Sequence, residues 1–145
     1  MTYRELEAYL YAYRELCVKE EALREVMRLL DSGGDVHGQK WSGVITDGGL
    51  PGSPVSMWYE ACEKCGGELE RIARITEGIR RMREDLRERS RYSPKCWDML
   101  GILEAVYMAG VSFGEYVRGR DDERTQYRRR RELVMMTGEY ICGEC

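Results

Sequence analysis

Apolar residues recur every three or four positions along two long segments, and this spacing leaves few folds open to the chain. In residues 2–30 the series comprises Tyr3, Leu6, Leu10, Tyr13 and Cys17, then Leu23, Met27 and Leu30. In residues 55–90 it comprises Trp58, Cys62, Cys65, Leu69, Ile72, Thr76, Ile79, Met82 and Leu86. In a helix such residues form one stripe. We therefore predict an all-α fold in which two long helices pack as an antiparallel hairpin.

A glycine-rich loop, residues 31–54, separates these two segments. A loop of this length in a compact domain is usually mobile or functional. Its glycines do not have the spacing of a phosphate-binding loop, which argues against a nucleotide site. Within the second long helix, Gly66 and Gly67 lower the helix propensity, and we expect a kink or a break there.

We predict two domains. Residues 1–90 form the helical hairpin domain, and residues 91–145 form a second domain. Ser93 and Pro94 are typical of a helix start, and we expect a helix over residues 94–109. Its inward residues are predicted to be Trp97, Leu100, Leu103 and Tyr107. Gly110 then stops the helix, and the sequence Ser112-Phe113-Gly114-Glu115 reads as a capping box that opens a short helix.

A third helix is expected after Gly119, where Asp121 and Asp122 are candidate N-caps. The following helix is expected to expose Arg124, Thr125, Gln126, Arg128 and Arg129, and to bury Tyr127, Val134 and Met135. One interpretation is an ordinary amphipathic helix with a solvated basic face. The other is a helix-turn-helix that places an arginine-rich helix in the major groove of DNA.

The second interpretation is favoured by a resemblance. Three stretches carry it: Leu103-Glu104-Ala105-Val106-Tyr107, then Ser112-Phe113-Gly114-Glu115-Tyr116-Val117, then Thr125-Gln126-Tyr127-Arg128-Arg129-Arg130. In this order they resemble the helix-turn-helix of sigma-factor region-four type at the C-terminus of phage late transcription regulators of the RinA/ArpU type. The resemblance implies a sequence-specific DNA-binding regulator of phage or prophage origin. At Gln126, however, that family usually buries a branched apolar residue.

On this interpretation, duplex DNA is the main partner. The groove-facing residues would be Arg124, Gln126, Arg128 and Arg129, with Thr125 beside them, and the phosphate-binding residues would be Arg118, Arg120 and Arg130. The helical hairpin would mediate homo-oligomerisation, or contact with RNA polymerase or another protein.

The distribution of charge agrees with a C-terminal DNA contact. The whole chain carries a net charge of −3. Residues 80–131 hold 14 Lys and Arg against 9 Asp and Glu, whereas residues 1–79 hold 9 against 14. Phosphate contacts are therefore expected from residues 80–131, and the N-terminal part is expected to stay away from DNA.

Other classes of function find little support in the sequence. No apolar run has the roughly twenty residues needed to span a bilayer, and the start lacks the pattern of a signal peptide, so we expect a cytoplasmic protein without a membrane partner. The single histidine, His37, has no recognisable catalytic partner. We expect no enzymatic activity and no cofactor.

The cysteines leave one alternative open. Cys62 with Cys65, and Cys142 with Cys145, are two CxxC pairs that could together hold zinc. The pairs lie far apart in the sequence, and Cys62 and Cys65 also fit the apolar stripe of a helix as small residues. We favour the second interpretation, with no metal site, and expect Cys17 and Cys96 to be buried.

An alternative hypothesis assigns the chain to another class of function. In it the protein is a helical protein-binding module, for example a phage factor that has lost DNA binding and inhibits or scaffolds a host protein. The net negative charge and the acidic N-terminal helix favour it. The acids Asp121, Asp122 and Glu123 also favour it, because they stand beside the end of the helix that would face DNA and would repel phosphate.

Overall fold

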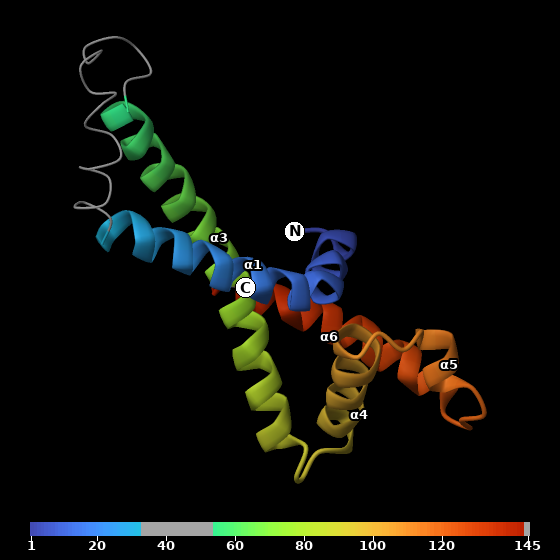
Figure 1. The fold of residues 1–145 in the computed structure, drawn as a ribbon. Coiled ribbons are helices and arrows are strands. Elements are labelled where there is room, and N and C mark those ends of the chain that lie inside the picture. Colours follow the sequence, from blue (N-terminus) through green and yellow to red (C-terminus); the bar gives the residue numbers. More distant parts are fainter. Residues whose placement is uncertain (33–53, 144–145) are drawn as a thin grey trace. The chain divides into compact units, whose positions relative to one another are not determined.

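The structure, a computed structural model, describes residues 1–32 and 54–143, and its regular elements there are all helices (Figure 1). They are α1 (Tyr3–Ser32), α3 (Pro54–Arg89), α4 (Pro94–Ile102), the π-helix η2 (Leu103–Met108), α5 (Phe113–Val117) and α6 (Glu123–Cys142). The all-α prediction is therefore confirmed. Most of the predicted glycine-rich loop, together with His37 and Cys145, lies outside the described residues. In the described part, no helix is long and apolar enough to cross a membrane.

The chain divides into two compact units, Met1–Cys17 with Arg74–Cys145, and Val18–Ala73. The first unit contains the main hydrophobic core, to which α1, α3, α4, η2, α5 and α6 all contribute. Its fully buried side chains include Leu10, Ile79, Met82, Leu86, Met99, Ile102, Leu103, Leu133 and Val134. In the second unit, Lys19 and Glu68 join α1 to α3 through a salt bridge of 2.6 Å.

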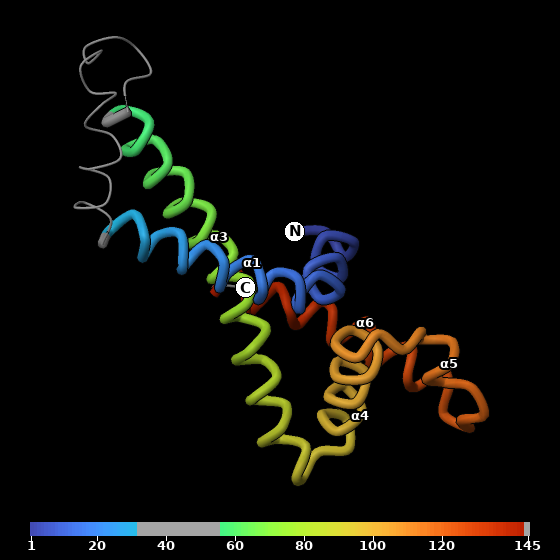
Figure 2. The backbone as a smooth tube through the Cα atoms, viewed as in Figure 1, coloured from blue at the N-terminus to red at the C-terminus, as the bar shows by residue number. Residues whose placement is uncertain are grey.

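Local signals in the sequence set the ends of several helices. Thr2 and Glu5 form a reciprocal capping box at the start of α1, with N···O distances of 2.8 and 3.2 Å. Ser93 caps α4, whose first residue is Pro94, and the chain reverses between α3 and α4 in Figure 2. Gly110 has a φ of 84°, the left-handed backbone conformation expected of a glycine that follows a helix.

The buried face of α4 differs from the predicted one. Trp97, expected to point inward, is 66% exposed, whereas Cys96 and Met99 are buried. The π-helix η2 follows, with the Ala109 amide bonded to the Glu104 carbonyl at 2.9 Å. A π turn holds an extra residue, so the faces of the helix are rotated relative to an α-helical stripe. Trp97 lies in α4, before this turn, together with the buried Cys96, Met99 and Ile102, so the buried stripe of α4 is itself shifted by one residue from the predicted one.

Two further expectations about burial are wrong. Met135 is 52% exposed and Cys17 is only partly buried, whereas Cys96 is buried as expected. At Gly66 and Gly67 a kink or a break was expected, and because α3 continues through both glycines there is no break. A helix of 36 residues can tolerate two glycines, because each costs only about 1 kcal/mol.

The helices α3 and α6 pack closely against each other at Gly78. A Cβ atom added there would lie 2.9 Å from the Tyr140 carbonyl oxygen and 3.2 Å from the Ile141 Cα. Both neighbours are backbone atoms, which cannot move without displacing α6. By contrast, a Cβ added at Gly67 would meet nothing within 4 Å.

We predict opposite effects of alanine at these two positions of α3. Gly78→Ala is expected to lower the free energy of unfolding by about 1–3 kcal/mol, because α6 must shift. Gly67→Ala is expected to raise helix stability by up to about 1 kcal/mol, because alanine is the better helix former and the site is open. Urea unfolding followed by circular dichroism measures both, and a Gly78→Ala protein as stable as the wild type would contradict the close approach.

A second prediction concerns alkaline pH. Partial burial, helped by a hydrogen bond from its hydroxyl to the Asp85 carboxylate, raises the pKa of Tyr140 from 10.0 to about 12. Because the folded pKa is the higher one, this contribution to stability is present below pH 10 and is lost as the pH rises toward 12. Tyr140→Phe should therefore lose less stability than the wild type over this interval, as measured by urea unfolding at several pH values. Equal losses in both proteins would contradict the assignment.

Candidate nucleic-acid interface

The segment that carries the predicted DNA contacts is built from α5, a glycine turn and α6. Ser112 Oγ accepts a hydrogen bond from the Glu115 amide at 3.2 Å and so caps α5 as expected. Phe113 and Val117 anchor this five-residue helix through burial. Gly119, with a φ of 77°, makes the turn toward α6. The N-cap residue of α6 is Asp122, as predicted, although its side chain makes no capping hydrogen bond to the backbone.

Gln126 does not face the solvent. Its side chain is fully buried, and its Nε2 donates to Asp122 Oδ2 at 2.9 Å. This hydrogen bond, followed by the interaction with Arg120, lowers the pKa of the Asp122 carboxyl. The expected exposure of Gln126 is therefore wrong. The amide instead occupies an inward position on α6 and stabilises the first turn of the helix through the acid at its N-cap.

Tyr127 shows the opposite deviation. It was expected to be buried but is 50% exposed, with its ring edge against the Phe113 ring at a centroid distance of 4.9 Å. The inward side of α6 is set by the fully buried Gln126, Leu133 and Val134. Adjacent residues on a helix point about 100° apart. Once Gln126 is inside, Tyr127 is therefore turned toward the edge of the buried face.

Arg130 is half-buried and contacts a cluster of side chains from three other elements of the first unit. Its Nη2 donates to Glu7 Oε2 on α1 at 2.8 Å, and the Tyr107 hydroxyl donates to the same oxygen at 2.8 Å. The guanidinium group also lies 4.7 Å from the Phe113 ring centroid. Burial, assisted by the Glu7 carboxylate, raises the pKa of Tyr107 well above its usual value of 10.0. The charge of Arg130 is thus already compensated within the protein.

Two further arginines from the predicted set also have internal partners. Arg129 is only 18% exposed and lies 3.7 Å from Asp98 and 3.5 Å from Glu132, so its expected exposure is wrong. Arg120 lies 3.2 Å from Asp122, and its guanidinium group stands over the Tyr116 ring at 5.1 Å. Such contacts restrict these side chains and reduce the charge that they present to an external phosphate.

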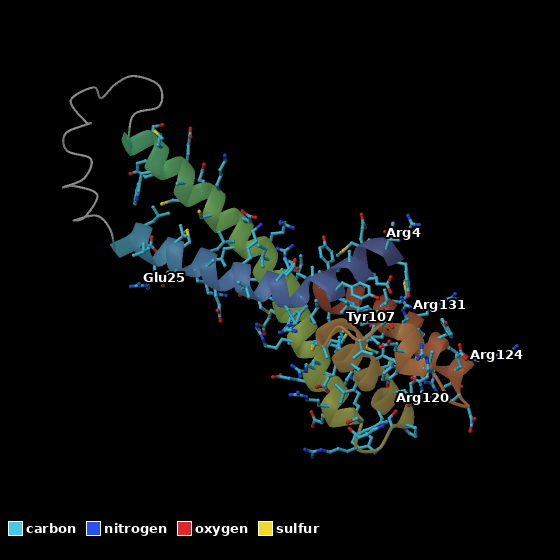
Figure 3. All side chains as sticks on the ribbon, turned by 45° about the vertical axis from the view of Figure 1, so that its right-hand side comes forward. Arg4, Glu25, Tyr107, Arg120, Arg124 and Arg131 are labelled. Carbon is cyan, nitrogen blue, oxygen red and sulfur yellow. The ribbon has the colours of Figure 1, made fainter. Side chains whose placement is uncertain are left out.

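The arginines that remain available share one side of α6. Arg124 and Arg128 are exposed, and so is Arg131, which the sequence interpretation left out. None of the three forms a salt bridge with another residue of the described ranges. We call Arg124, Tyr127, Arg128 and Arg131 the arginine face of α6. Their spacing of three and four residues is a signal that could have identified Arg131 from the sequence. Figure 3 shows Arg124 and Arg131 pointing away from the ribbon.

The other two predicted contacts lie at the edge of this surface. Arg118, at the C-cap of α5, is exposed, whereas Thr125 is half-buried. Of the eight predicted residues, the structure therefore leaves Arg118, Arg124 and Arg128 fully available. The other five are buried, half-buried or engaged with acids of the same chain.

The cysteine pairs give no metal centre among the residues that can be described. Cys62 and Cys65 are half-buried on α3, and Cys142 is exposed. Partial burial, followed by the charges of Asp31 and Cys65, raises the pKa of the Cys62 thiol, which disfavours the thiolate that a metal would need. Within residues 1–32 and 54–143 no three His, Cys, Asp or Glu side chains are placed to bind one ion.

We predict that Arg130 and Arg128 differ in their effect on folding. Arg130→Ala is expected to lower the free energy of unfolding by about 2 kcal/mol, because it leaves the Glu7 carboxylate partly buried without its cation. Arg128→Ala removes an exposed side chain and is expected to change stability by less than about 0.5 kcal/mol. Chemical unfolding of both variants measures the difference, and equal effects would contradict the division of the arginines into those paired with an acid of the first unit and those that are exposed.

No family model, curated protein or solved structure matches this chain. A function for the arginine face is therefore inferred from its own chemistry, which combines uncompensated guanidinium groups with an exposed aromatic ring on one helix.

Proposed function

We propose that the protein binds duplex DNA through α5 and α6 and acts as a sequence-specific transcription regulator of phage or prophage origin. In this proposal α5, the Gly119 turn and α6 form a helix-turn-helix whose second helix enters the major groove. The resemblance of the sequence to late regulators of the RinA/ArpU type is part of the support. The helices α1 and α3 would then form a hairpin for self-association or for contact with RNA polymerase.

The observation that carries the proposal is the arginine face of α6. From Arg124 to Arg131 the helix rises by about 10 Å, which is comparable with the width of the major groove. Arginine binds phosphate and guanine in a bidentate manner, and it does so best when no acid of its own protein competes. Arg124, Arg128 and Arg131 meet this condition in the described part of the chain.

The positions suggest a division of roles. Arg124 lies in the first turn of α6, and the N-terminal residues of a recognition helix are those that contact base edges. Arg128, Arg131 and the exposed Arg118 would bind backbone phosphates, which fix the register of the helix on the duplex. Gln126, Arg129 and Arg130 are left out of the direct contacts because they serve the fold.

The acids at the start of α6 are partly neutralised, which weakens their electrostatic repulsion of a DNA phosphate. Asp122 interacts with both Arg120 and Gln126. Asp121 and Glu123 stay exposed and would repel a phosphate placed next to them. The proposal therefore places the DNA backbone beside Arg128 and Arg131, two turns further along α6, and not beside the N-cap.

A second candidate function, the helical protein-binding module, is favoured by exposed apolar side chains. Trp97 on α4 is 66% exposed, and Met135 on α6 is 52% exposed. Tryptophan and methionine are enriched in protein interfaces. A protein partner bound there would not require the arginine face, so substitutions at Trp97 and at Arg128 separate the two candidates.

We predict salt-dependent binding to duplex DNA that is weakened by alanine on the arginine face. Arg124→Ala and Arg128→Ala should each weaken binding, and Arg128→Ala should reduce the slope of log K against log salt by about 0.9, because one phosphate contact is lost. Arg124→Ala should also reduce the preference for one sequence over another, if it contacts a base. Fluorescence anisotropy with a labelled duplex from the flanks of its own gene, and with a scrambled duplex, measures both effects.

The matched control is Arg91→Ala, which removes one exposed arginine from the turn between α3 and α4. It changes the net charge by the same amount and should leave the salt slope unchanged. A wild-type protein without salt-dependent affinity for any duplex refutes the DNA-binding proposal. If Trp97→Ala then abolishes capture of a protein partner while Arg128→Ala does not, the second candidate is the better account.

A further inference from the structure

A surface hollow lies between the start of α1 and the middle of α6, both in the first unit. Its lining comprises Tyr3 from α1 with Tyr127, Arg128, Arg130 and Arg131 from α6. The tyrosine rings and the methylene stems of the arginines supply apolar walls, while the guanidinium groups supply charge. A site with this lining suits a ligand that has both a compact apolar part and an anionic group.

The charges around the hollow are only partly balanced. The charge of Arg130 is paired with Glu7, 2.8 Å away. Arg128 and Arg131 form no salt bridge in the described ranges. Arg4 does not line the hollow, but it follows the lining residue Tyr3 on α1 and is exposed. Cations gathered around one hollow repel one another, and an anion that enters it removes this repulsion. Figure 3 shows Arg4 and Arg131 directed away from the ribbon.

The sugar–phosphate unit of a nucleic-acid strand has the required chemistry. Its phosphate accepts bidentate hydrogen bonds from guanidinium groups, and its sugar has apolar edges that pack against aromatic rings. The hollow also shares Tyr127, Arg128 and Arg131 with the arginine face. A strand that passes along that face therefore reaches the hollow without leaving the protein surface.

We infer that one backbone phosphate of the bound duplex lies in this hollow, held by Arg128 and Arg131, and that Tyr3 and Arg4 make the start of α1 part of the DNA-binding surface. This inference rests on the proposed function. It also revises the expectation, drawn from the summed charge of residues 1–79, that the N-terminal part avoids DNA. Contact with DNA depends on the charge of the side chains near the hollow and not on the total charge of residues 1–79. Near the hollow the charge of Glu7 is already neutralised by Arg130.

The test compares Arg4→Ala and Arg131→Ala with Arg124→Ala and with the control Arg91→Ala, all by anisotropy with the same duplex over a range of salt. All four side chains are exposed, so unchanged thermal midpoints are expected and are checked first. Arg4→Ala and Arg131→Ala should each reduce the salt slope by about 0.9, whereas Arg91→Ala should not.

A second measurement identifies the phosphate itself. Single phosphates of the duplex are replaced in turn by uncharged methylphosphonates. One replacement should weaken binding of the wild type but have a much smaller effect on Arg131→Ala, because the same contact is removed from either side. Additive losses at every phosphate would mean that Arg131 contacts none of them, and they would overturn the inference.

The two proposals fail in different ways. If the wild type binds the duplex and Arg124→Ala weakens it, but Arg4→Ala and Arg131→Ala bind like the wild type, then α6 binds DNA and the hollow does not. If the wild type binds no duplex at any salt concentration, the proposed function and the inference are both overturned. Binding that depends on Arg4, Arg124 and Arg131 but not on Arg91 supports both.

Discussion

The carboxylate of Glu7 is the point at which three helical elements of the first unit are joined. Glu7 belongs to α1, and its Oε2 atom accepts hydrogen bonds from Tyr107 on η2 and from Arg130 on α6. A partly buried carboxylate is costly without a cation, so α6 is held in the register that brings Arg130 to Glu7. The same register determines which of the neighbouring arginines can reach solvent.

A run of four arginines is divided by the geometry of the helix. Residues 128–131 follow one another at about 100° around the axis of α6, so they cannot all point in the same direction. Arg129 and Arg130 turn toward acids of the same unit, while Arg128 and Arg131 remain exposed. The run that looks like a single basic patch in the sequence therefore supplies two arginines that are paired with acids of the same unit and two available cations.

This division also explains why net charge is a poor guide to the surface. Glu7 and Glu132 add to the negative total, but both are engaged with cations of the first unit. Acids that are paired inside the fold contribute little to the field outside it. The proposals for DNA binding depend on Arg124, Arg128 and Arg131, whose charges are not offset by a salt bridge in the described part of the chain.

The sequence by itself determined the features that depend on neighbouring residues along the chain. The caps at Thr2, Ser93 and Ser112, the glycine turns and the helical character of each segment follow from local hydrogen bonds and backbone freedom. Only the tertiary structure decided which face of each helix is buried. Trp97 is outside because Cys96 and Met99 take the buried side of α4. Gln126 is inside, where its amide nitrogen donates to Asp122, although its Oε1 atom is buried without a hydrogen-bond partner in the described part of the chain. Burial depends on partners that are distant in sequence, and the spacing of residues within one helix does not contain that information.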